Sequence, residues 1–103
     1  MRSHDIIAYL KTLKHDLKSE GIVSVGLFGS CAKDTQTKHS DIDIVYKTTD
    51  KFIHKHKGWT AFTYLNTNLR DKVSMKFKSH TDMFDINSDS ALKDKIMSQA
   101  IYA

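Results

Sequence analysis

Residues 22–47 read IVSVGLFGSCAKDTQTKHSDIDIVYK, and this stretch decides the fold. Its first seven residues are mainly apolar and β-branched, which is typical of a buried strand. That strand runs directly into Gly29-Ser30, and ten residues separate this pair from Asp41-Ile42-Asp43. The stretch therefore joins a turn suited to phosphate to two carboxylates on a second strand, which indicates metal-assisted chemistry on a nucleotide.

Gly29 and Ser30 suit a phosphate group for two physical reasons. A glycine lets a polyphosphate come close to the backbone, and a serine before a helical turn over residues 31–33 offers a hydroxyl and N–H groups near the positive end of the helix dipole. Turns also use Gly-Ser pairs without binding anything. The Walker-type phosphate loop and the dinucleotide fingerprint are excluded, because the residues that each requires do not follow. The Gly29-Ser30 pair therefore indicates phosphate binding only in combination with the carboxylates that follow it.

The second predicted strand covers residues 41–47 and separates two faces. With a period of two, Asp41, Asp43 and Val45 share one face, and the other face carries Ile42, Ile44 and Tyr46. The two carboxylates stand about 7 Å apart and repel each other unless a cation intervenes. A hydrated Mg²⁺ suits such oxygen ligands, and a two-ion site would stabilise both the attacking and the leaving oxygen. The alternative interpretation is a sheet edge that uses charges against aggregation.

A two-ion site calls for a third carboxylate, and Asp82 is the best candidate. It lies on a predicted third strand over residues 81–86. Asp85 stands at an odd spacing from it and should face away, so it is only the fallback candidate. The histidines show no spacing with cysteine that is typical of a metal site, and Cys31 has no histidine at a spacing that would make it a nucleophile. The predicted metal ligands are therefore Asp41, Asp43 and Asp82.

Hydrophobic periodicity predicts three helices around these strands. The first has Ser3 as its N-cap and ends at Gly21, with core positions at Ile6, Leu10, Leu13 and Leu17. The second follows an ambiguous stretch, 48–57, with core positions at Trp59, Phe62, Leu65, Leu69, Val73 and Phe77. Ser88 or Asp89 caps the last helix, whose core positions are Leu92, Ile96 and Ala100. The order helix, strand, turn, strand, helix, strand, helix predicts an α/β (α+β) fold.

Length and composition predict one domain over residues 1–103 with an anionic partner. The chain is 40% hydrophobic and carries a formal net charge of +4, which favours a nucleotide, RNA or an acidic protein. No apolar run approaches the roughly 18 residues that span a bilayer, and one cysteine rules out an internal disulfide framework. We therefore expect a cytoplasmic protein without a membrane partner. Because so short a chain leaves little room for a second substrate domain, a protein partner should complete its function.

Residues 27–33 and 40–44 together resemble the signature of the polymerase-β-like nucleotidyltransferases. The resemblance is to their minimal single-domain branch, which supplies the antitoxins of HEPN/MNT toxin–antitoxin modules, and it extends to the opening helix, to residues 81–84 and to residues 96–102. It implies a small mixed β-sheet flanked by helices. It also implies that ATP binds through Gly29, Ser30 and Lys33, and that two Mg²⁺ ions are held by Asp41, Asp43 and Asp82.

The activity implied by the resemblance is AMP transfer. A hydroxyl attacks the α-phosphorus of ATP, pyrophosphate leaves, and Asp82 helps to deprotonate the hydroxyl, which would be a tyrosine of a HEPN RNase toxin. Direct binding of nucleic acid is compatible with the charge but is not expected. The chain departs from the family pattern where Lys33-Asp34 replaces the usual Arg-Gly and Thr81 replaces a valine. Two alternatives stay open: an antitoxin that acts by occlusion, and a nucleotidyltransferase for a small molecule.

Overall fold

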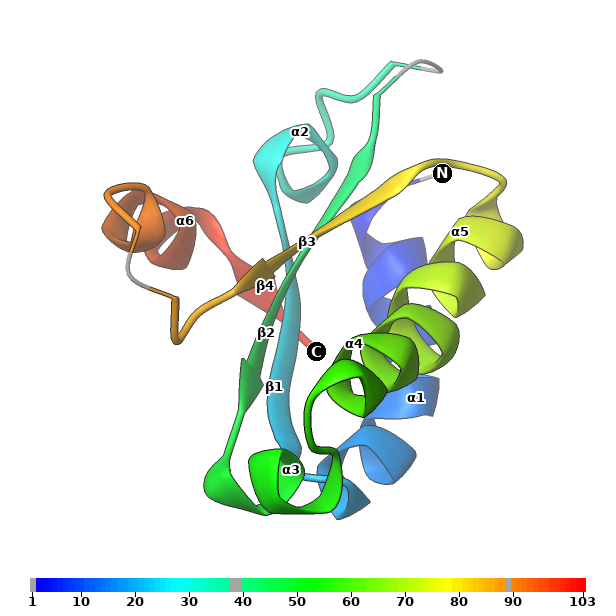
Figure 1. Cartoon of the computed structure of the whole chain (residues 1–103). Helices are drawn as coiled ribbons and strands as arrows, with labels where there is room; N and C mark the ends of the chain where they lie inside the picture. The colour runs from blue at the N-terminus through cyan, green and yellow to red at the C-terminus, as the bar shows by residue number, and fades with distance from the viewer. Residues whose placement is uncertain (1, 38–39, 89) are drawn as a thin grey trace.

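The computed structural model, which describes residues 2–37, 40–88 and 90–103, contains a four-stranded sheet with the order β3-β2-β1-β4. Strand β1 pairs antiparallel with both β2 and β4, and β2 pairs parallel with β3. The sheet is therefore mixed, as predicted (Figure 1). The strands are β1 (Ile22–Phe28), β2 (Ile42–Thr48), β3 (Thr81–Asp85) and β4 (Ile101–Tyr102).

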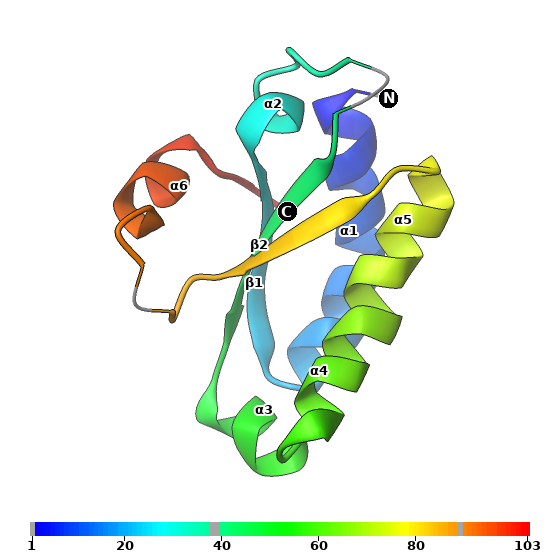
Figure 2. The ribbon, with the colours of Figure 1, turned by 45° about the horizontal axis from the view of Figure 1, so that its top comes forward.

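Helices cover both faces of this sheet. One face is covered by α1 and by a central rod, which is made of α4, the π-helical turn η1 and α5. Helix α6 lies on the other side (Figures 1 and 2). No helix among the described residues is both long and apolar enough to cross a membrane. The helical segments are α1 (Ser3–Ser19), α2 (Gly29–Ala32), α3 (Asp50–Lys55), α4 (Trp59–Leu65), η1 (Asn66–Arg70), α5 (Asp71–Phe77) and α6 (Lys93–Gln99).

The two apolar clusters follow the alternation of β2. Ile42 and Ile44 are buried in the larger core with α1 and the central rod, whereas Val45 packs with Ile86 and Ile96 under α6. The predicted segregation of side chains on this strand is confirmed. Asp43 shares this face of β2 with Val45, but Val45 is buried whereas Asp43 is only half-buried. The polar part of this face therefore lies at the N-terminal end of β2.

The opening helix is confirmed, but its predicted N-cap is wrong. Ile6, Leu10 and Leu17 are buried as expected. The N-cap is Arg2, whose backbone N–H donates to Asp5 Oδ2 at 3.1 Å, and Ser3 is the first helical residue. The Ser3 backbone N–H donates to Asp34 Oδ1 at 2.7 Å, and its hydroxyl donates to Oδ2 at 2.8 Å. An acceptor from a distant loop thus takes the place of a local serine cap.

The central helix has a different core face from the one predicted. Leu65, Leu69 and Val73 are buried, but Trp59 is 84% exposed and Phe62 is 63% exposed. Successive steps of four residues overshoot an α-helical turn of 3.6 residues, and the wider turn at η1 compensates for this drift. Ala61, four residues before Leu65, packs against the core, so Phe62 is displaced to the flank.

Other departures concern the ambiguous stretch and the C-terminal segment. Residues within 48–57 form α3, and α6 begins at Lys93 after the N-cap Leu92, not after Ser88; Asp89 lies outside the described residues. Leu92 is 59% exposed, contrary to its predicted core position, whereas Ile96 is buried. Ala100 packs against the smaller cluster after the helix has ended. The two-residue strand β4 was not predicted, because so short a strand has no detectable periodicity.

Candidate functional site

The parallel pairing of β2 with β3 brings the predicted carboxylates together. Asp43 is the Cα partner of Asp82, so both side chains lie next to each other on one face of the sheet. Asp41 directly precedes β2, which begins at Ile42 and not at residue 41. The Ile42 N–H donates to the His80 carbonyl at 2.9 Å, which fixes the strand entrance beside the residue before β3. Asp82 therefore stands beside Asp43 at the site, and the fallback Asp85 pairs with Tyr46 farther along.

A histidine that sequence reasoning did not select also belongs to this cluster. One potential ligand atom each from Asp41, His80 and Asp82 lie within 4.8 Å of one another, and all three residues are exposed. His80 Nε2 lies 3.0 Å from Asp82 Oδ1. The spacing of two between His80 and Asp82 was a usable signal, because alternate residues along an extended segment share a face. It went unused because the predicted strand over residues 81–86 did not include His80.

Asp43 lies deeper and contacts α2 (Gly29–Ala32), the turn that is predicted to bind phosphate and is called the phosphate turn below. It is half-buried, and a Cβ at Gly29, where φ is +72°, would collide with its carboxylate. Burial raises the pKa of Asp43, and the negative charges of Asp82 and Asp41 raise it further. Three carboxylates thus concentrate negative charge at one end of β2 and β3, an arrangement that a cation would stabilise.

The phosphate turn is helical from Gly29, two residues earlier than predicted, and ends at Ala32 with Lys33 as its C-cap. Ser30 is half-buried in this turn and Lys33 is exposed. Cys31 is fully buried, and its thiol donates to the Asp41 carbonyl at 3.5 Å. Burial and then the charge of Asp43 raise the pKa of this thiol. Cys31 therefore ties the turn to Asp41 and is a poor candidate for a nucleophile, as predicted.

The substituted loop after this turn keeps a glycine-like backbone. Asp34 has a φ of +55°, in the left-handed region where aspartate is tolerated better than most residues. Hydrogen bonds from the Ser3 backbone and then the Ser3 hydroxyl lower the pKa of Asp34. The N–H of Thr35 also donates to the Ser30 carbonyl at 3.0 Å. The replacement of glycine by Asp34 thus preserves the turn and adds a link to α1.

A groove of about 210 Å³ opens beside Asp82, between β3 and the central rod. Phe62, Asn66 and Arg70, spaced four residues apart, form the wall from α4 and η1. Thr81, Asp82 and Met83 contribute to the wall from β3. The exposed side chain of Phe62 therefore lines the same groove as Asp82, a predicted site residue.

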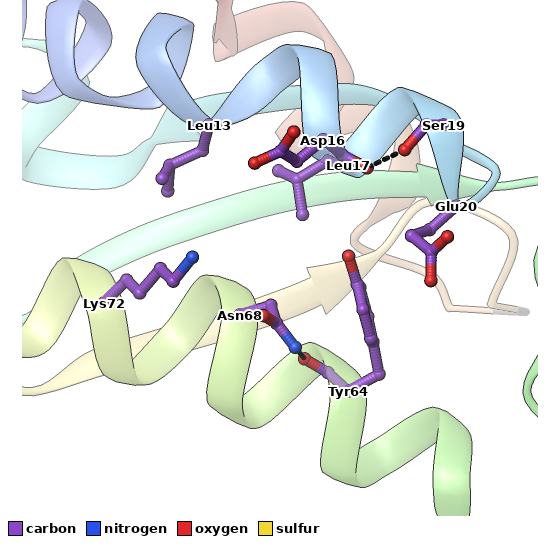
Figure 3. A pocket seen from close by; sticks show the side chains of 8 residues that line it. All are labelled: Leu13, Asp16, Leu17, Ser19, Glu20, Tyr64, Asn68 and Lys72. Carbon is purple, nitrogen blue, oxygen red and sulfur yellow. Dashed lines mark hydrogen bonds between the residues drawn. The ribbon is translucent and has the colours of Figure 1, made fainter.

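A second cavity, of about 240 Å³, lies between α1 and the central rod, away from the predicted site residues (Figure 3). Tyr64 lines it, and burial raises the pKa of this tyrosine, as do the charges of Glu20 and Asp16. Glu20 is already engaged by Lys55 and by His56, which lies at 3.0 Å. This cavity contains none of the groups that the sequence predicted for phosphate or metal binding.

Comparison with known proteins gives a family match and several similar folds. Residues 7–102 match the family described as Polymerase beta, Nucleotidyltransferase. A search of curated proteins gave no match. A protein assigned as a minimal nucleotidyltransferase has a TM-score of 0.70 at 17% identity, over 98% of this chain and 95% of that chain.

Two further similar structures are toxin–antitoxin complexes. One, with AMP-PNP, has a TM-score of 0.62 at 24% identity, over 90% of this chain and 68% of that chain. The other contains a tri-AMPylated Shewanella oneidensis HEPN toxin with an MNT antitoxin, and its TM-score is 0.60 at 20% identity, over 97% of this chain and 70% of that chain.

At sequence identities this low, the structural matches establish similarity of fold alone. The similar folds confirm the predicted mixed sheet flanked by helices. The family match is stronger evidence because it covers nearly all of the chain. It includes the phosphate turn, the acidic end of β2 and the strand that carries Asp82. The chain belongs to the polymerase beta nucleotidyltransferase family.

Proposed function

We propose that this protein transfers AMP from ATP to a hydroxyl group, most simply a tyrosine, of a HEPN-domain toxin and thereby neutralises it. The observation that carries the proposal is the register of β2 and β3, which pairs Asp82 with Asp43, the carboxylate that lies against Gly29. Two findings support the choice of reaction and partner. One similar structure is a toxin–antitoxin complex with AMP-PNP, and another contains a tri-AMPylated HEPN toxin. Use of ATP would place the reaction in the cytoplasm.

The proposed Mg²⁺ ions would be held by Asp41, Asp43 and Asp82. Their carboxylate oxygens are the ligands that Mg²⁺ prefers. The raised pKa of Asp43 supports this fit, because it reflects uncompensated negative charge from its two neighbours as well as burial. When bound, Mg²⁺ would neutralise developing charge on the phosphate oxygens.

The chain's own residues would divide the work of binding and proton transfer. Gly29 leaves the space beside Asp43 open, while the Ser30 hydroxyl and the Lys33 ammonium bind the triphosphate. Asp82 accepts the proton of the acceptor hydroxyl. The acceptor oxygen then forms a bond to the α-phosphorus as the bond from that phosphorus to pyrophosphate breaks. The products are an AMP-modified acceptor and pyrophosphate.

The groove beside Asp82 is the proposed approach for the acceptor. A polypeptide segment lying in this groove would contact Phe62, Asn66 and Arg70 beside Asp82. An exposed aromatic side chain beside an amide and a guanidinium suits a polypeptide segment better than a small hydrophilic metabolite. This wall thus favours a protein acceptor over the small-molecule alternative.

The proposal predicts that a HEPN-domain protein is encoded beside this gene, and mass spectrometry of that HEPN protein tests the proposed reaction. After incubation with ATP, Mg²⁺ and this protein, the HEPN protein should gain the mass of one or more AMP units. The Asp41→Asn/Asp43→Asn double variant should give no gain, while Asp85→Asn, a control on β3, should act like the wild type. A confirmed complex whose partner gains no mass would refute the catalytic proposal. A double variant that still protects cells from the toxin would instead support neutralisation by occlusion.

A further inference from the structure

His80 is held beside the acidic cluster by the backbone, independently of its side chain. Its carbonyl accepts the N–H of Ile42 at 2.9 Å, so its Cα is tied to the entrance of β2, next to Asp41. It stands two residues before Asp82, and its Nε2 lies 3.0 Å from Asp82 Oδ1. The His80 side chain is 64% exposed, so it contributes little to the core. The ring is thus positioned at the cluster and yet open to ligands.

If only His80 and Asp82 were close together, their contact would be an ordinary surface hydrogen bond. Exposed pairs of this kind contribute little to stability. A third group converges on the same point, however, because a carboxylate oxygen of Asp41 also lies within 4.8 Å of the other two ligand atoms. Two carboxylates and an imidazole that converge in this way supply the kinds of donor atom that divalent metal sites use.

We propose that His80 is a direct ligand of the divalent ion at this site and biases the site toward Mn²⁺ over Mg²⁺. The inference rests on the proposed function only in placing an ion among these aspartates. Mg²⁺ strongly prefers oxygen ligands. First-row transition ions accept an imidazole nitrogen more readily than Mg²⁺ does, and Mn²⁺ is the member of that series that also keeps a preference for carboxylate and water oxygens, so an imidazole ligand among these aspartates favours Mn²⁺ over Mg²⁺.

The experiment uses the full chain and Mn²⁺ itself as the probe. Electron paramagnetic resonance measures how much Mn²⁺ is bound, and electron spin echo envelope modulation detects a nitrogen nucleus bonded to it. The wild-type complex should show nitrogen modulation that shifts when histidine is isotopically labelled. In His80→Asn the modulation should vanish and the affinity for Mn²⁺ should fall about tenfold. The affinity for Mg²⁺, measured by competition, should change much less.

A matched control is His54→Asn, which alters another exposed histidine, on α3. It should keep both the modulation and the affinity. Bound Mn²⁺ without nitrogen modulation in the wild type, or modulation that persists in His80→Asn, overturns the inference. The wild-type measurement does not depend on how the variant folds. The readout is metal binding and not AMP transfer, so the two proposals can fail separately. Wild-type protein that shows nitrogen modulation but transfers no AMP would count against the proposed function and leave the His80 assignment standing.

Discussion

Substitution of Gly29 by alanine tests how the phosphate turn and the acidic site depend on each other. Gly29 has a φ of +72°, where a side chain is strained by about 1–2 kcal/mol. In a domain of about 100 residues, each 1 kcal/mol lowers the melting temperature by roughly 4–8 °C. Gly29→Ala should therefore lower the melting temperature by roughly 4–16 °C.

The same substitution should weaken metal binding by a separate route. The new Cβ would collide with Asp43 Oδ2, but it would lie 3.5 Å from Asp43 Cβ, an ordinary contact. Only the carboxylate head then has to move, so the strand stays in place while Asp43 loses its orientation. By comparison with other changes that disorient a metal ligand, the affinity for Mg²⁺ or Mn²⁺ should fall roughly 10-fold or more.

Thermal unfolding with and without the metal, together with direct titration of the metal, separates these two effects. Gly58→Ala is the control, because Gly58 also has a positive φ, +60°, and an added Cβ there would meet nothing within 4 Å. The control should lose stability yet keep its affinity for the metal. An unchanged affinity in Gly29→Ala would refute the placement of Asp43 against the turn, and an unchanged melting temperature would refute the strained backbone.

Three further substitutions or reactions probe the surroundings of the site. Without metal, Asp43→Asn should raise the melting temperature, because the charged carboxylate is disfavoured by burial and by its neighbours. Stability of the wild type should rise as the pH falls through the raised pKa of Asp43, and calorimetry at several pH values should show that the variant lacks this rise. Ser3→Ala should lower stability at neutral pH and raise the pKa of Asp34, measured by NMR titration; the stability difference should disappear as the pH falls through the lowered pKa of Asp34, and equal stability at neutral pH would contradict the link. The Cys31 thiol should react with a thiol reagent only after unfolding, because it is buried with a raised pKa, and rapid reaction of the native protein would contradict this placement.

The fold was predictable where one periodicity acts over a whole element. The helical spacing from Ile6 to Leu17 and the alternation on β2 report local geometry, and both are confirmed. Trp59 and Phe62 fit the helical stripe equally well, yet they are exposed, because a π turn that begins at Asn66, four residues after Phe62, changes the phase of the helix. The repeated spacing of four residues from Leu65 to Phe77 is compatible with such a turn, but it does not specify where along the helix the turn occurs.

The candidate site was predictable only to the extent that it is local. Alternation on one strand was enough to place Asp41 and Asp43 together. The proximity of Asp82 depends on the register between β2 and β3, which the spacing within either strand does not specify. His80 joins the cluster through that same register, and the contact of Asp43 with Gly29 depends on the register of β1 with β2, which pairs Asp43 with Phe28. These features arise from tertiary packing.

Asp34 shows how a departure from a family pattern can have a structural cause. A glycine at this position would supply the left-handed backbone alone, whereas Asp34 supplies it and also accepts two hydrogen bonds from Ser3. Those donors lie at the first turn of α1, where the helix dipole favours a negative charge. The preceding residue, Lys33, is then held between this link and the short helix α2, so its backbone position is defined on both sides. In the proposed phosphate site Lys33 would therefore act as a point charge on a flexible, exposed side chain that starts from a defined backbone position, without the bidentate fork of an arginine.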